Sequence, residues 1–207
     1  MRDSGASRSY LKSKTSREAA SQKQKSEQGP AGWFERRAER VAELWLTEVR
    51  SRDARRRSKP DDLLERFFTL LAQMLPSSFG AYREQIEPLW LQAAELFGSV
   101  AAQRGLAAGE AVDEFQILRE VLIRELYSDP PPGGPLTVRD VLQLNRIIDK
   151  GVAQASIGHA DALFFALFRG SGVPESLDED VTREVTAQLV AIQHEFRATM
   201  ALLEGRG

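Results

Sequence analysis

Residues 137–168, TVRDVLQLNRIIDKGVAQASIGHADALFFALF, decide the fold of this chain. Apolar residues recur in this stretch at helical spacing, which predicts one long helix. Thr137 followed three positions later by Asp140 resembles an N-terminal cap, although Glu or Gln is the usual partner. The break DPPPGGP at residues 129–135 precedes the stretch, and the Gly- and Pro-containing segment 170–174 ends it.

Helical periodicity continues on both sides of this stretch. Outside it, the pattern predicts helices over residues 32–52, 60–75, 80–104, 109–127 and 174–203. Pro88 lies inside the third of these, where we expect a kink or a late helix start. No segment alternates over the length of a strand. We therefore predict an all-α protein with a single helical bundle of about six helices.

The two ends of the chain differ from this bundle. Residues 1–30 hold seven basic and three acidic side chains and almost no large apolar ones, which predicts a disordered basic tail. The tail is either a solvated leader or an arm for an acidic partner, nucleic acid or anionic lipid. The helical domain is expected over residues 31–173, and an amphipathic C-terminal helix over residues 174–207. The net charge of −2 argues against nucleic-acid binding by the whole chain.

Composition removes several classes of function. Cysteine is absent, which excludes disulfides, thiolate metal sites, iron–sulfur clusters and a cysteine nucleophile. We find no run approaching the roughly 18 apolar residues of a membrane span and no apolar stretch typical of a signal peptide. A cytoplasmic protein with no membrane partner is therefore expected.

The sequence also lacks the usual catalytic patterns. Its two histidines are His159 and His194, and neither belongs to a G-x-S-x-G or H-E-x-x-H arrangement. No glycine-rich phosphate loop is present, and no Glu-x-x-His pairs suited to a di-metal bundle occur. We expect no enzymatic activity, no metal and no cofactor. Among the charges of residues 109–127, Glu114 and Arg119 stand out because they lie near apolar positions.

Four polar residues share one side of the long helix 137–168. They are Asn145, Asp149, Ser156 and His159. The helix is otherwise apolar nearly all round, and helices of that kind are usually buried. One interpretation is an internal polar network that sets helix register or a helix–helix dimer. The other is a small-ligand pocket in which His159 donates a hydrogen bond or titrates near neutral pH.

Several short segments carry a resemblance to a known family. They are DLLERFF (62–68), EPLW (87–90), AQRG (102–105), EFQILRE (114–120), LNRIID (144–149), ASIGH (155–159) and DALFF (161–165). In this order they resemble the N-terminal domain of RsbT co-antagonist proteins of the RsbRD type. The same domain is found at the N-terminus of certain bacterial sensor histidine kinases. The resemblance spans about residues 40–173.

The resemblance implies a bacterial input domain that perceives or relays a stress signal, dimerises and has no enzymatic activity. Asn145, Arg146, Asp149 and His159 match its motifs as signature positions, not as ligands. Only one helix follows residue 173. We therefore expect a sensory or adaptor domain that meets a regulatory protein or a kinase in trans.

The last predicted helix has near-heptad apolar spacing, which suits a partner helix. Its apolar positions are Leu177, Val181, Val185, Leu189, Ile192, Phe196, Met200 and Leu203. Within it, His194-Glu-Phe-Arg197 resembles the phosphoacceptor box of a histidine kinase, but Ala198, Thr199 and Met200 depart from that pattern. His194 is therefore interpreted either as a solvent-facing side chain or as a phosphoacceptor in a degenerate dimerisation helix served by a separate kinase.

Overall fold

The computed structural model describes residues 29–53, 62–78, 80, 82–132, 134, 136–169, 177 and 179–205. Regular structure within these residues is helical, and they contain no strand, which confirms the all-α prediction. The helices are α2 (Pro30–Glu35), α3 (Ala38–Asp53), α4 (Asp62–Met74), the 3-10 turn η1 (Pro76–Ser78), α5 (Arg83–Gln103), α6 (Ala108–Ser128), α7 (Val138–Phe168) and α8 (Glu179–Glu204). The predicted tail lies, up to residue 28, outside the described residues.

The predicted long helix is α7, and its N-terminal cap forms as expected. The Asp140 amide donates to the Thr137 hydroxyl at 3.2 Å, and the Thr137 amide donates to the Asp140 carboxylate at 3.0 Å. Both ends of the cap thus satisfy backbone amides that a helix leaves open. The predicted first helix, by contrast, is interrupted by a turn at residues 36–37. The interruption lets α2 bury Trp33 and Phe34 while α3 follows its own direction.

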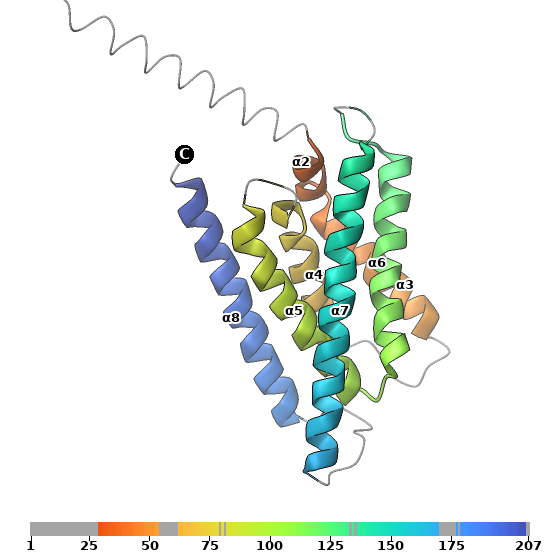
Figure 1. The fold of residues 1–207 in the computed structure, drawn as a ribbon, viewed down its shortest axis with the longest axis vertical. Helices are drawn as coiled ribbons and strands as arrows, with labels where there is room; N and C mark the ends of the chain where they lie inside the picture. The colour runs from red at the N-terminus through yellow and green to blue at the C-terminus, as the bar shows by residue number, and fades with distance from the viewer. Residues whose placement is uncertain are drawn as a thin grey trace, which may run out of the picture.

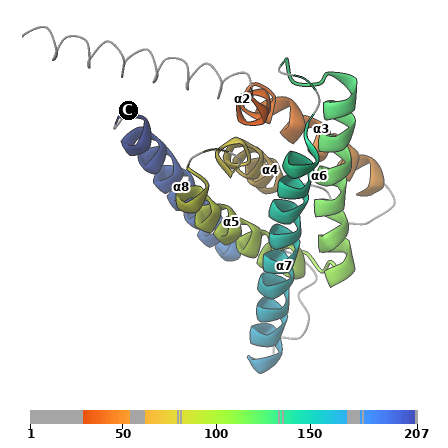
Figure 2. The ribbon, with the colours of Figure 1, turned by 45° about the horizontal axis from the view of Figure 1, so that its top comes forward.

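The helices are arranged around α5 and α7, which have the most extensive mutual packing in the molecule. On one side of this pair, α8 packs on α5 and α4; on the other, α6 packs on α7 and α3. Figures 1 and 2 show α8 lying along α5, away from α6. The α4 helix packs between α3 and α5. The bundle therefore leaves one side of α7 with no helix in front of it (Figure 1).

Aromatic rings fill the core between α3, α4, α5 and α6. Trp45 stacks on Phe68 with ring centroids 3.9 Å apart, and Phe97 meets Phe115 edge to face at 5.4 Å. These four rings are fully buried. Aromatic pairs of this geometry contribute about 0.5–1.5 kcal/mol each beyond the area they bury. The rings fix how α3 and α4 meet the α5–α6 pair.

Small residues bring α5 and α7 into backbone contact. A Cβ atom at Gly98 of α5 would lie 1.8 Å from the carbonyl oxygen of Ala155, and one at Gly158 of α7 would lie 2.0 Å from that of Glu95. A Cβ at Gly151 would meet the indole of Trp90 at 2.3 Å. Larger side chains at these positions cannot fit without separating the helices. The glycines therefore set the distance between α5 and α7.

Ion pairs tie α3 to α6 along their outer sides. They are Arg40–Glu125 at 2.7 Å, Arg52–Glu120 at 2.7 Å and Arg124–Glu48 at 2.9 Å. The hydrogen bond and charge of Glu125 raise the pKa of Arg40 above its ordinary value, so the guanidinium keeps its charge. The pairs Arg52–Glu120 and Arg124–Glu48 are largely exposed, and exposed ion pairs contribute little to stability. The core residues, rather than these pairs, hold α3 in place.

The α7 helix is only partly buried, unlike the expectation from its apolar composition. Its inner residues pack on α5 and α6, but Phe164 and Phe168 near its C-terminal end are 64% and 82% exposed. Figure 1 shows this end projecting past the neighbouring helices. Periodicity identified the apolar positions, but whether a second element covers each face depends on residues elsewhere in the chain. One face of α7 therefore remains in contact with solvent.

By length and composition, α7 is also a helix that could cross a membrane. Its most apolar 18-residue window has a mean hydropathy of 1.2. The sequence alone led us to expect no such segment. Core helices of water-soluble bundles meet the same criteria. The cytoplasmic localisation therefore stays a prediction.

Candidate functional site

The buried member of the four predicted polar residues is His159. Its Nε2 atom lies 2.8 Å from the carbonyl oxygen of Leu106, in the connection between α5 and α6. Because a carbonyl only accepts, Nε2 carries the hydrogen in this bond. His159 as a whole is 3% exposed. His159 thus joins α7 to the α5–α6 connection.

The other three residues form bonds elsewhere. The Asn145 side chain donates to the carbonyl oxygen of Val141 at 3.0 Å, and the Ser156 hydroxyl donates to that of Val152 at 2.8 Å, both within α7. Asp149 pairs with Arg119 of α6. In the described part of the chain, no hydrogen bond joins any two of the four predicted residues. Their assignment to one polar network or one ligand pocket stays a prediction.

A buried ion pair lies where α5 ends and α6 begins. The guanidinium of Arg104 and the carboxylate of Glu114 approach to 3.6 Å, with side chains only 4% and 2% exposed. The backbone carbonyl of Glu114 also accepts the indole N–H of Trp45 at 2.6 Å. The apolar neighbours of Glu114 along the sequence pointed to its burial. Nothing in the sequence pointed to Arg104 as its partner.

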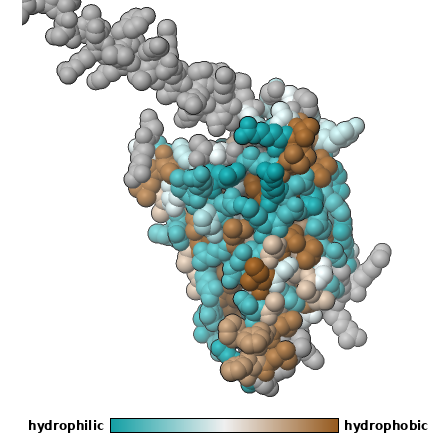
Figure 3. All heavy atoms as spheres, viewed as in Figure 1, coloured by the Kyte–Doolittle hydropathy of each residue, from teal (hydrophilic) through white to brown (hydrophobic). Residues whose placement is uncertain are grey.

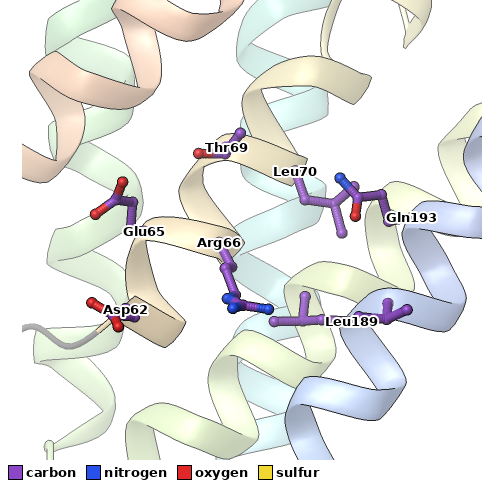
Figure 4. A pocket seen from close by; sticks show the side chains of 8 residues that line it. Asp62, Glu65, Arg66, Thr69, Leu70, Leu189 and Gln193 are labelled. Carbon is purple, nitrogen blue, oxygen red and sulfur yellow. The ribbon is translucent and has the colours of Figure 1, made fainter.

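A cavity of about 340 Å³ lies between α4 and α8. It is lined by Asp62, Glu65, Arg66, Thr69, Leu70, Leu189, Val190 and Gln193. Figure 4 shows Arg66 reaching across from α4 toward Leu189 of α8, with the two carboxylates on the other side of α4. Its volume is at the lower end of the range of about 300–1,000 Å³ typical of small-molecule sites. No sequence pattern identified this cavity, because its walls come from segments over 100 residues apart.

His194 follows Gln193, a wall residue of this cavity, and lies on the exposed side of α8. An exposed imidazole is accessible to a second protein. Among the described residues, no group of three or more His, Asp or Glu side chains is arranged to hold a metal ion.

Most of the large apolar residues that are exposed in the described part of the chain lie on α7. We define the outer face of α7 by the residues Val138, Leu142, Arg146, Ala153, Ile157, Ala160, Phe164 and Leu167, with Asp161 and Phe168 along one edge. All ten residues are exposed. They lie opposite the buried residues of α7, which pack on α5 and α6. Figure 3 shows apolar surface at both ends of this side of the molecule and mostly hydrophilic surface between them.

Comparisons of this chain with protein-family models, with curated proteins and with solved structures find no match. The resemblance to the RsbRD-type N-terminal domain therefore stays a prediction. Function is inferred below from that resemblance and from the surfaces of the chain itself.

Proposed function

We propose that this chain is a non-catalytic bacterial sensory or adaptor domain that takes part in stress signalling. It acts through protein–protein contacts in trans, with a regulatory protein or a kinase as partner, and it works as a homodimer in the cytoplasm. The segments that resemble the RsbRD-type domain support the signalling part of this proposal. The outer face of α7 supports the proposal that the chain acts through protein–protein contacts.

The observation that carries the proposal is the exposure of large apolar residues on α7. Soluble proteins rarely leave contiguous apolar surface of more than a few hundred Å² in water, and larger patches mark interaction sites. The polar residues of α7, by comparison, are occupied in bonds that hold helices together, such as those of His159 and Asp149. A surface for binding is therefore better supported than a centre for chemistry.

Genetic complementation tests this proposal. In the bacterial host of the gene, deletion should change the output of a stress-response reporter, and the wild-type gene should restore it. The double variant Phe164→Glu/Phe168→Glu should fold but fail to restore the output, because it places charges on the outer face of α7. Leu202→Glu, at an exposed apolar position of α8, is the matched control and should restore it. A deletion without effect, or full restoration by the double variant, would contradict the proposal.

Phosphotransfer through His194 is the second candidate, and the exposure of this residue on α8 favours it. Incubation with an active histidine kinase and labelled ATP should then label the wild-type chain but not His194→Ala. Equal labelling of both proteins, or labelling of neither, would exclude it.

A small-molecule receptor is the third candidate, and the cavity between α4 and α8 favours it. A thermal-shift screen of metabolites can separate two locations. A shift that is lost in Arg66→Ala but kept in His159→Ala would place the ligand in this cavity, whereas the reverse would place it beside α7. No shift for any metabolite would argue against a receptor.

A further inference from the structure

We infer that two copies of this chain pair through the outer face of α7, with the two α7 helices antiparallel and a twofold axis passing beside Ala153. The inference rests on the proposed function in one respect, that the chain works as a homodimer. It adds the surface and the register of the pairing. Each of these can be wrong while the signalling role stands.

The outer face is available for such a pairing along the whole helix. Buried residues such as Leu144, Ile148 and Ala155 point to the opposite side, toward α5 and α6. The positions of the outer face recur every three or four residues from Val138 to Arg146 and from Ala153 to Leu167, which is the spacing of a helix–helix seam. Between these two stretches the exposed residues on this side are Asp149 and Lys150. In the middle of the seam, Ala153 and Ala160 are small enough for a second helix to approach closely.

Antiparallel pairing about Ala153 matches apolar residues with apolar residues at the two ends of the face, whereas Ile157 near the axis falls opposite Asp149. A twofold axis beside residue 153 places Leu142 of one copy opposite Phe164 of the other. It also places Val138 opposite Phe168. Because the arrangement is symmetric, each contact occurs twice. The two apolar ends of the face, which are separated on one copy, therefore cover each other in the pair.

The same register matches charges. Arg146 of one copy falls opposite Ala160 of the other and next to its Asp161. Within the described residues of one chain, neither Arg146 nor Asp161 forms an ion pair, although both are exposed. Lys150 and Asp149, which lie between them along the helix, already pair with Glu87 and Arg119. The second copy would thus supply a partner for Arg146 and for Asp161.

The area is sufficient for a specific dimer. Large aromatic side chains bury about 150–250 Å² each, so the exposed parts of Phe164, Phe168 and the aliphatic residues of the face supply roughly 500 Å² per copy. Specific interfaces bury at least about 1,000 Å² in total. The outer face reaches this value when its apolar residues are fully covered on both copies.

A second copy explains the charges better than a lipid surface does. A helix that lies in a membrane interface keeps its charges on the polar side and its apolar face continuous. Arg146 instead lies in the middle of the outer face, between the two apolar ends. Asp161 beside the phenylalanines would also be repelled by anionic headgroups.

Single-cysteine crosslinking tests the surface and the register together, and the natural absence of cysteine makes the result easy to interpret. Ala153→Cys lies beside the axis, so under oxidation it should give a disulfide-linked dimer. Ala160→Cys should not, because in this register its two copies are 14 residues out of alignment, about 21 Å along the helix. Ala198→Cys, exposed on α8, is the control for random collision.

Charge exchange tests the pairing of Arg146 with Asp161 in the full chain. The wild-type protein should have about twice the 23.1 kDa mass of one chain by light scattering. Arg146→Asp and Asp161→Arg should each weaken the dimer roughly tenfold or more, because like charges then face each other. The double variant carries the exchanged pair and should return to dimer. Circular dichroism should show unchanged helicity in all three.

Four outcomes would overturn the inference. A strictly monomeric wild-type protein would show that the chain does not form the dimer. A dimer in which Ala153→Cys gives no crosslink would show that the outer face of α7 is not the interface. If Ala160→Cys crosslinked as efficiently as Ala153→Cys, the antiparallel register about Ala153 would be wrong. Flotation of the wild-type chain with phosphatidylcholine vesicles, lost in Phe168→Glu, would assign the face to lipid instead. In each case the deletion arm of the reporter experiment still decides the signalling role, because it does not depend on the outer face of α7.

Discussion

Two regions of this molecule share the helix α7 but differ in how their residues are covered. On the inner side, where α5, α6 and α7 meet, Gly98 and Gly158 allow backbone contact, and His159 and the Arg104–Glu114 pair are buried. On the outer face of α7, phenylalanine and leucine side chains remain exposed. The glycines therefore distinguish the two regions. The helix face that a neighbour covers is the one on which glycines allow the neighbouring backbone to come close.

The largest effect is expected from the buried ion pair of the inner region. Glu114→Ala leaves the guanidinium of Arg104 buried without its carboxylate and should lower the free energy of unfolding by about 3–5 kcal/mol. Glu120→Ala breaks the exposed pair with Arg52 and should lower it by less than about 1 kcal/mol. Urea denaturation measures both. Equal losses for the two variants would mean that the α5–α6 corner is open to solvent.

The glycine contact should produce the next largest effect. Gly98→Ala places a Cβ atom 1.8 Å from the carbonyl oxygen of Ala155, and backbone cannot move aside as a side chain can. Overpacking of this kind should lower the free energy of unfolding by about 1–3 kcal/mol or more. Gly109→Ala, where no atom lies within 4 Å, should leave stability unchanged or raise it by up to about 1 kcal/mol. A neutral Gly98→Ala would show that α5 and α7 are farther apart.

Among the four predicted polar residues of α7, replacement of His159 should lower the free energy of unfolding clearly, and replacement of the other three should change it little. His159→Ala removes the bond to the carbonyl of Leu106 in the core and should lower the free energy of unfolding by about 1–3 kcal/mol. Asn145→Ala removes a partly exposed bond within the helix and should change it by less than about 0.5 kcal/mol. Thermal unfolding monitored by circular dichroism measures the difference. Similar losses for both would support the shared network that the sequence suggested.

The sequence predicted local features better than long-range ones. The cap at Thr137 and the break before it determine where α7 begins, and both can be recognised within a few residues. The partner of His159 is 53 residues away, and Arg104 meets Glu114 across a helix connection. Spacing along one helix gives the side on which a residue lies, but it cannot identify what lies opposite. For that reason the sequence grouped four polar residues of α7 by side but did not identify the partner that each one has in the structure.

The smallest effect on the stability of one chain is expected at the outer face. Phe164→Ser and Phe168→Ser replace side chains that are mostly exposed, so each should change the free energy of unfolding by less than about 0.5 kcal/mol in dilute protein. The same residues are opposed by the second copy in the proposed pair. The melting temperature of the wild-type chain should therefore rise with protein concentration, because association stabilises the folded form.

In the double variant Phe164→Ser/Phe168→Ser this concentration dependence should be lost, while the melting temperature in dilute protein stays the same. Leu202→Ser, on α8, is the control and should behave as the wild type. The melting temperature in dilute protein and its dependence on concentration test different points. A large drop in dilute protein would mean that the end of α7 packs on its own chain, so the two regions would not differ. An unchanged concentration dependence would leave the contrast between the regions intact and move the contact to another surface.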